Sequence, residues 1–343
     1  MTPTEVKKVK TLLSKPRNIV IVTHWSPDGD AMGSSLGLYN YLIQKKHKVQ
    51  VITPNDYPVF LAWLPGNKKV IDFSAHPEKA ASKVAKADFI FCLDFNSLKR
   101  IDLLGNEVAN SKAVKMIIDH HLQPDDFADY LLHSIQACST CELIYDFIYL
   151  MGDRSVLTKD VANCLYTGIM TDTGSFRYPS TTAKTHRIVS ELIAAGAENA
   201  NIHDLVYDNN SEARLKLLGY CLAEKLTVLE ESETAYFALS QEDLQKFNYK
   251  KGDTEGVVNY ALSMKHVRFS AFFVERDGII KISFRSKGKF DVNQFARKHF
   301  NGGGHANAAG GMSALSLPET IEKFRSILPE YKKQLTTKRT TIR

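Results

Sequence analysis

Segment 24–30 places three side chains that could bind a metal within seven residues. His24 supplies an imidazole, and Asp28 and Asp30 supply carboxylates. Two carboxylates this close repel each other and raise each other's pKa unless a cation neutralises them. Mixed nitrogen and oxygen donors suit manganese, iron, cobalt or zinc better than calcium, whose sites use oxygen alone. The same residues could instead form a surface turn in which an aspartate caps the following helix, so this segment alone leaves both interpretations open.

Three further candidate ligands lie later in the chain. Asp94 and His120 each come at the end of a short apolar stretch that is typical of a buried strand, and Asp172 lies in a polar segment that we expect to be a loop. In parallel sheets, ligands bind beyond the carboxyl ends of the strands. We therefore expect these side chains to converge with those of segment 24–30 in one crevice.

Apolar, β-branched stretches alternate with helical patterns through the first half of the chain. Strands separated by helices are typical of a parallel, doubly wound sheet. We therefore predict an α/β fold with a doubly wound, mainly parallel sheet. The predicted strands are 19–22, 49–53, 88–94 and 113–119, and the predicted helices are 31–46, 96–104, 139–152 and 158–170.

From residue 225 onward the pattern changes to paired strands with a few helices. The dipeptide Asp277-Gly278 is a hairpin-turn signal between two β-rich stretches. This predicts a second, smaller mixed α/β domain. We divide the chain into a metal-binding catalytic domain (1–185), a helical linker (186–224), a substrate-binding domain (225–335) and a frayed tail (336–343).

Composition restricts the classes of function. The 44 Lys and Arg residues against 38 Asp and Glu give a net charge of +6, which tolerates an anionic substrate but is not a nucleic-acid signature. The sequence contains no run of about 18 apolar residues, so we expect no membrane span. The five cysteines are odd in number and scattered, which indicates a reducing compartment, and we interpret the C-x-x-C of Cys138 and Cys141 as structural. We expect a cytoplasmic protein that does not bind a membrane.

Six candidate ligands exceed what one ion needs if water and substrate also bind, but they suit two ions that share a carboxylate. Their motifs resemble those of the DHH phosphoesterase family. The matching motifs are HWSPDGDAMGS at 24–34, LD at 93–94, DHH at 119–121 and TDTGSF at 171–176. Residues 283–311 also resemble the family's associated C-terminal domain, so the resemblance covers nearly the whole chain.

The resemblance, together with the spacing, implies two divalent cations bridged by Asp94. We take Mn²⁺ as the first choice, with Mg²⁺ or Co²⁺ as alternatives, and expect hydrolysis of phosphoester bonds by water whose pKa the metal lowers. One cation is assigned to His24, Asp28 and Asp94, and the other to Asp30, Asp94, His120 and Asp172.

The two remaining polar residues of the D-H-H motif are assigned to catalysis. His121 is the candidate that binds the phosphate or protonates the leaving group. A histidine that only orients Asp119, or that is itself a ligand, is the alternative. We expect Asp119 to fix a histidine tautomer rather than to bind a metal.

A glycine-rich segment, Gly302-Gly303-Gly304-His305, marks the second domain. Consecutive glycines let backbone N–H groups turn toward an anion, and we expect a following helix to add positive potential. Arg285, at the end of a predicted strand, offers a bidentate phosphate fork. With the resemblance, we interpret Arg285, His305, Gly303 and Gly304 as binding the phosphate that is not cleaved.

A site divided between two linked domains predicts a short ligand rather than a long polymer. We expect hydrolysis of very short oligoribonucleotides to nucleoside 5′-monophosphates, and of 3′-phosphoadenosine 5′-phosphate (pAp) to AMP and phosphate. The alternatives are a phosphodiesterase for linear or cyclic dinucleotides, an inorganic pyrophosphatase, and a non-catalytic nucleotide- or RNA-binding module. The expected partners are therefore short single-stranded RNA or phosphorylated nucleotides. The oligomeric state is open, with a homodimer as one option.

Overall fold

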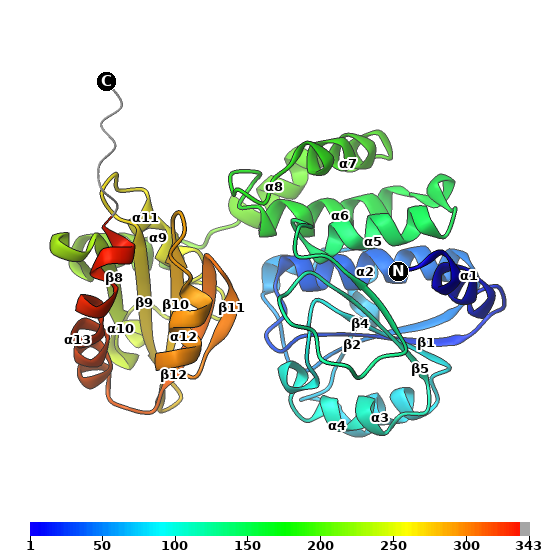
Figure 1. Cartoon of the computed structure of the whole chain (residues 1–343), viewed down its shortest axis with the longest axis horizontal. Coiled ribbons are helices and arrows are strands. Elements are labelled where there is room, and N and C mark those ends of the chain that lie inside the picture. Colours follow the sequence, from blue (N-terminus) through cyan, green and yellow to red (C-terminus); the bar gives the residue numbers. More distant parts are fainter. Residues whose placement is uncertain (337–343) are drawn as a thin grey trace. The chain divides into compact units, whose positions relative to one another are not determined.

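The computed structural model describes residues 1–336, which form two compact units (Figure 1). The first unit is Met1–Asn209, and the second begins at Asn210. The predicted division into catalytic domain, linker and substrate-binding domain stays a prediction. Of the predicted tail, residues 337–343 lie outside the described residues.

Six parallel strands form the sheet of the first unit, in the order β3-β2-β1-β4-β5-β6. The order reverses between β1 and β4, which is where ligands bind in doubly wound sheets. The predicted α/β fold with a parallel sheet is thus confirmed. The strands are β1 (Asn18–Thr23), β2 (Lys48–Thr53), β3 (Ile71–Asp72), β4 (Phe89–Leu93), β5 (Val114–Asp119) and β6 (Tyr130–His133).

Helices cover both faces of this sheet (Figure 1). Strand β1 is buried on both sides because its apolar residues alternate between the two cores: Ile19 and Ile21 face one core, and Val20 and Val22 face the other. The first core includes α2 (Gly29–Gln44), α5 (Thr140–Leu150) and α6 (Lys159–Asp172), and the second includes α3 (Pro77–Ala85) and α4 (Leu104–Asn110). The remaining helices of this unit are α1 (Pro3–Leu12), α7 (Ala183–Ala194) and α8 (Asn199–Tyr207).

The second unit contains a six-stranded mixed sheet in the order β11-β12-β10-β9-β8-β7. Only β8 and β9 run parallel, and the other neighbours in the sheet are antiparallel. The predicted mixed α/β character is confirmed. The strands are β7 (Leu226–Leu229), β8 (Thr234–Leu239), β9 (Phe269–Arg276), β10 (Ile279–Ser286), β11 (Gly303–His305) and β12 (Ala308–Ser313).

Strand β9 also serves two cores. Phe269 and Phe273 pack toward Phe324, whereas Phe272 and Val274 belong to the opposite core. Helices on both faces therefore hold this sheet. They are α9 (Glu212–Glu224), α10 (Gln241–Lys246), α11 (Val257–Leu262), α12 (Val292–His299) and α13 (Leu317–Leu335). None of the helices in residues 1–336 is long and apolar enough to cross a bilayer.

Three local predictions were wrong. The helix predicted over 96–104 is a 3₁₀ turn, η3 (Leu98–Ile101), followed by α4, because Asp102 adopts a left-handed φ of 49° that ends the first turn. Asp172 is the last residue of helix α6 rather than a loop residue. No helix follows the glycine-rich segment, because residues 303–313 form the β11-β12 hairpin. A Cβ on Gly302, the residue before β11, would lie 1.9 Å from the carbonyl oxygen of Gly310 in β12.

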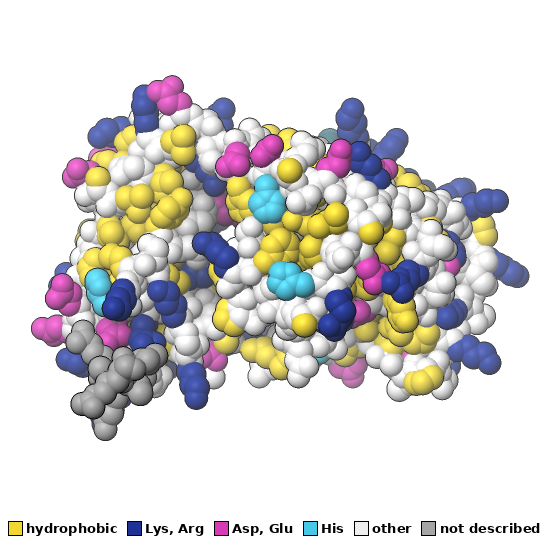
Figure 2. All heavy atoms as spheres, turned by 90° about the horizontal axis from the view of Figure 1, so that it is seen from above, with side chains coloured by type: hydrophobic (Ala, Val, Ile, Leu, Met, Phe, Trp, Pro, Cys, Tyr) yellow, Lys and Arg dark blue, Asp and Glu magenta, His cyan; other side chains and the backbone are white. Residues whose placement is uncertain are grey.

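The Asp-Gly hairpin is confirmed, and both of its turn residues have positive φ values. The five cysteines are buried free thiols, which agrees with a structural role for Cys138 and Cys141. On the face shown in Figure 2, Lys and Arg side chains are scattered among acidic and uncharged ones and form no continuous basic stripe.

Candidate active site

Neighbouring strands bring the first group of candidate ligands together. Thr23 at the end of β1 pairs with Leu93 at the end of β4, so the next residues, His24 and Asp94, emerge side by side. His24 Nε2 lies 3.4 Å from Asp94 Oδ2 and 3.9 Å from Asp28 Oδ1. Asp28 is also the N-cap of α2, since its Oδ1 accepts hydrogen bonds from two backbone N–H groups of the first turn. Asp28 therefore caps the helix and belongs to a three-residue cluster with His24 and Asp94.

A second cluster surrounds His120, which directly follows β5. His120 Nε2 lies 3.8 Å from Asp30 Oδ2, 3.6 Å from Asp172 Oδ2 and 3.5 Å from Asp94 Oδ1. Asp30 comes from the first turn of α2, and Asp172 from the end of α6. The structure thus brings together all six residues proposed as metal ligands, from five separate elements: the ends of β1, β4 and β5, the start of α2 and the end of α6.

Asp94 lies between the two clusters. Its Oδ2 faces His24 and its Oδ1 faces His120. The residue adopts a left-handed φ of 63°, which costs free energy in an aspartate and persists only where the surroundings enforce it. The Thr140 hydroxyl donates a 2.9 Å hydrogen bond to Oδ1 and fixes the carboxylate between the two sets of ligands.

The N-terminus of α5 holds Asp30. The backbone N–H groups of Thr140 and Cys141 donate to its two carboxylate oxygens at 2.6 and 2.9 Å, and the positive end of a helix favours a carboxylate. Helix α6 approaches closely at Gly168, where a Cβ would lie 2.1 Å from Cys141 Sγ and 2.9 Å from Asp30 Oδ1. This close approach requires glycine, because a Cβ there would force Cys141 or Asp30 to shift.

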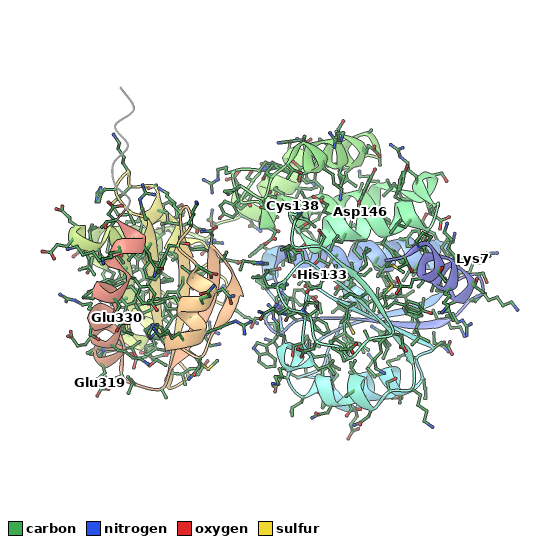
Figure 3. All side chains as sticks on the ribbon, viewed as in Figure 1. Lys7, His133, Cys138, Asp146, Glu319 and Glu330 are labelled. Atoms are coloured by element: carbon green, nitrogen blue, oxygen red, sulfur yellow. The ribbon has the colours of Figure 1, made fainter. Side chains whose placement is uncertain are left out.

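Asp119 and His121 form a buried pair next to Asp94, whose Oδ1 lies 3.7 Å from His121 Nδ1. His121 Nδ1 lies 2.7 Å from Asp119 Oδ1, and the backbone N–H of His121 donates to Asp119 Oδ2 at 3.2 Å. His133, labelled in Figure 3, contacts the carbonyl oxygen of His121 through Nε2 at 2.6 Å. The ring of His121 is thus held through Nδ1 by a carboxylate, and the role expected of Asp119 in fixing its tautomer stays a prediction.

Charges at the centre act strongly on one another. The pKa of Asp30 is raised well above its usual value, mainly by burial and next by the negative charges of Asp94 and Asp172. Burial alone would raise the pKa of Asp94, but hydrogen bonds with His120 and His24 hold it well below its usual value. Four carboxylates, two of them buried, lie close together here and therefore need compensating positive charge.

The histidines respond in two different ways. Burial opposes protonation of His24 and His120, but hydrogen bonds with Asp94 outweigh it, and the pKa of each ring is raised, that of His120 strongly. Burial lowers the pKa of His121 in spite of the hydrogen bond with Asp119. His24 and His120 thus lie where positive charge is favoured, whereas the neutral ring is favoured for His121.

These observations fit a divalent-metal site. Each cluster offers imidazole nitrogen and carboxylate oxygen atoms that lie within 4.8 Å of one another, which is the donor set of manganese-type ions rather than calcium. A cation in each cluster would also relieve the repulsion that raises the pKa of Asp30.

In the second unit, the predicted substrate-binding residues share one part of the sheet. Arg285 on β10 and His305 on β11 both lie opposite Ala308 of the intervening β12. Directly opposed residues of antiparallel strands project to the same face, so Arg285 and His305 share a face about 10 Å apart. Gly303 and Gly304 precede His305 on β11, and the N–H of Gly304 donates to Asn293 Oδ1 at 3.0 Å.

Sequence reasoning missed Thr140. A threonine one residue after the N-cap Ser139 is unremarkable in sequence, and only the fold brings its hydroxyl to Asp94, 46 residues earlier. The one available signal was the helix start itself, because the N-terminus of a helix is a natural partner for buried carboxylates.

Comparisons with known proteins agree with this geometry. The sequence profile of the "DHH family, N-terminal domain" matches residues 18–169, and that of the "DHHA1 domain" matches residues 233–334. The chain is 31% identical to the Streptococcus mutans protein named "Probable bifunctional oligoribonuclease and PAP phosphatase NrnA", over 93% of this chain and 97% of that protein. It is 27% identical to "Cyclic-di-AMP phosphodiesterase GdpP" of Bacillus subtilis, over 94% of this chain and 49% of that protein.

A solved structure is similar over both units. The crystal structure of an exopolyphosphatase-related protein from Bacteroides fragilis superposes with a TM-score of 0.93 at 43% identity, covering 97% of this chain and 98% of that one. The fold and the two clusters define a metal-binding hydrolase. The chain belongs to the DHH family of phosphoesterases and carries the DHHA1 domain, as the sequence motifs predicted.

Proposed function

We propose that the protein is a two-cation phosphoesterase that hydrolyses very short oligoribonucleotides to nucleoside 5′-monophosphates, and pAp to AMP and phosphate. The observation that carries this proposal is the position of Asp94, whose two oxygens face two separate clusters of ligands. Sites that hold two ions about 3.5 to 4 Å apart stabilise both the entering and the leaving oxygen of phosphoryl transfer. The similarity to the Streptococcus mutans protein supports the choice of substrates.

His24, Asp28 and Asp94 would hold one cation, and Asp30, Asp94, His120 and Asp172 the other. When bound, such ions lower the pKa of coordinated water and neutralise charge on the phosphoryl group. Mn²⁺ is our first choice because both clusters combine imidazole and carboxylate donors. Mg²⁺ and Co²⁺ are the alternatives.

The reaction forms a bond between a water oxygen and phosphorus and breaks the bond between phosphorus and the ribose oxygen. One water proton is released, and the leaving ribose oxygen takes up a proton. Asp119 engages His121 through Nδ1, so the ring would meet the substrate through Nε2. We propose that His121 Nε2 takes up the proton that the water releases, and that the ring then positions the phosphoryl group or passes this proton to the leaving oxygen, while Asp119 keeps the ring in the required orientation.

Residues of the second unit would bind the phosphate that is not cleaved. Arg285 and His305 share a face of the mixed sheet, and a guanidinium binds phosphate in a bidentate manner. Gly303 and Gly304 would allow the backbone to approach the phosphate closely.

A dinucleotide phosphodiesterase is the second candidate. The similarity to the cyclic-di-AMP phosphodiesterase favours it, and the same centre would act on the same bond type. The two candidates differ in substrate rather than in chemistry, so one assay separates them. Short linear dinucleotides such as pApA would be substrates under both.

The test compares substrates on one preparation. Metal-stripped protein is supplied with Mn²⁺ and incubated separately with a two- to five-nucleotide RNA, pAp, pyrophosphate and cyclic di-AMP. We expect turnover of the RNA and pAp that requires the metal, and little turnover of pyrophosphate. Fast hydrolysis of cyclic di-AMP with none of pAp would replace the first candidate by the second.

A variant of Asp94 tests whether the activity depends on the proposed metal centre. Asp94→Asn should abolish turnover and leave a folded protein, whereas Asp243→Asn, a buried aspartate of the second unit, should retain activity. Retained activity of Asp94→Asn, in protein free of trace wild type, would contradict the bridging role.

A further inference from the structure

Trp25 is an exposed aromatic residue inside the segment that carries the candidate metal ligands. It directly follows His24, whose side chain is buried, yet 44% of Trp25 is exposed. Among the large hydrophobic side chains exposed in residues 1–336, it is the one adjacent in sequence to a proposed ligand. Tryptophan is usually well buried, because exposing its ring to water costs free energy. An exposed indole at this position therefore needs a reason.

The backbone around Trp25 is tightly held. Its N–H donates to the carbonyl oxygen of Arg100 at 2.8 Å, and its own carbonyl oxygen lies 2.8 Å from His24 Nδ1. The next residue, Ser26, has a left-handed φ of 55°, and its N–H donates to Asn55 Oδ1 at 2.6 Å. The indole thus projects from a fixed support, and the same hydrogen bond that orients His24 also fixes Trp25.

We propose that Trp25 is a stacking platform for the nucleobase of the bound nucleotide, an inference that rests on the proposed function. Adjacent Cα atoms lie about 3.8 Å apart, so the Trp25 side chain starts one residue from His24, which belongs to the proposed metal cluster with Asp28 and Asp94. In a nucleotide, the ribose separates the base from the phosphate, so a platform beside the metal centre, rather than within it, meets the base. The Trp25 contact selects substrates that carry a base over base-free phosphate esters.

Stacking suits a nuclease that accepts any base. Every base has a flat face that can stack on an aromatic ring, so the contact strengthens binding about fivefold to a hundredfold without demanding one sequence. A rigid platform loses little side-chain freedom when the base binds. Trp25 would therefore act mainly on KM, whereas the metal ligands act on kcat.

Kinetics test the platform against a merely structural role. The substrates are pAp and its base-free analogue, 1-deoxyribose 3,5-bisphosphate, and the variants are Trp25→Ala and Trp25→Phe. We expect Trp25→Ala to raise KM for pAp about tenfold with kcat nearly unchanged, Trp25→Phe to restore most of the loss, and neither to change KM for the base-free analogue. An unchanged KM for pAp, or an equal rise for both substrates, would overturn the proposal.

Fluorescence tests the contact without turnover. The chain has two tryptophans, so the Trp63→Phe variant emits from Trp25 alone and the Trp25→Phe variant from Trp63 alone. We expect AMP, but not ribose 5-phosphate, to quench the Trp63→Phe variant and to leave the Trp25→Phe variant unchanged. Absent quenching where calorimetry shows AMP bound, or no binding of AMP at all, would refute the platform. If the wild type fails to hydrolyse pAp, the proposed substrate fails, but this titration still decides the role of Trp25.

Discussion

Replacing Thr140 by valine removes one hydrogen bond from the centre and changes little else. The Thr140 hydroxyl donates to Asp94 Oδ1 at 2.9 Å, both side chains are buried, and valine has nearly the same shape. A hydrogen bond to a charged group contributes about 1.5 to 3 kcal/mol. Mutating a residue that orients a metal ligand typically lowers metal affinity or activity about 10- to 100-fold. We therefore expect Thr140→Val to weaken Mn²⁺ binding, or to lower kcat, by about tenfold to a hundredfold.

Titration calorimetry with Mn²⁺ and turnover of pAp measure the two effects separately. Thr140→Ser keeps the hydroxyl and should stay near wild type. Thr167→Val is the matched control, because Thr167 is also fully buried and its hydroxyl donates within α6 to the carbonyl oxygen of Asn163. If Thr140→Val binds Mn²⁺ and turns over pAp within twofold of the Thr167→Val control, the reasoning about Asp94 is refuted.

Three further predictions address other parts of the molecule. Arg285→Ala should raise KM for pAp and leave kcat nearly unchanged, and an unchanged KM in steady-state assays would argue against phosphate binding by Arg285. Gly168→Ala should lower the free energy of unfolding by about 1 to 3 kcal/mol, because the added Cβ has no room. Gly219→Ala, where a Cβ meets nothing within 4 Å, should raise the free energy of unfolding by about 0.5 to 1 kcal/mol. Equal midpoints of urea unfolding for the two variants would contradict this prediction. Mn²⁺ affinity should fall as the pH drops through the raised pKa values of His24 and His120, because the cation needs both rings unprotonated. Since both pKa values are raised above 6.5, the loss of affinity should begin above that pH. A Mn²⁺ affinity that calorimetry finds independent of pH would count against this prediction.

The fold class was predictable because its signals are local and strong. Buried strands such as β1 and β4 have continuous apolar, β-branched or aromatic sequences, and helical patterns separate them. The parallel arrangement then implied that the residues after these strands would meet. Short edge strands such as β6 were not predicted, because four residues such as Tyr130–His133 show little periodicity. The β11-β12 hairpin was missed because glycine and alanine carry no strand signal.

The candidate site was partly predictable for a different reason. Ligands such as His24, Asp94 and His120 could be proposed because their side-chain types and motifs stand out in the sequence. Thr140 could not, since its contribution depends on where helix α5 packs against the end of the sheet. The exposure of Trp25 likewise depends on tertiary structure, because the sequence pattern does not distinguish an exposed tryptophan from a buried one.

A crystal of the Mn²⁺-loaded protein, with anomalous scattering collected at the manganese absorption edge, tests the central claim most directly. We expect two peaks about 3.5 to 4 Å apart, one beside His24 and one beside His120, with Asp94 contacting both. A single peak, or two peaks of which only one touches Asp94, would contradict it.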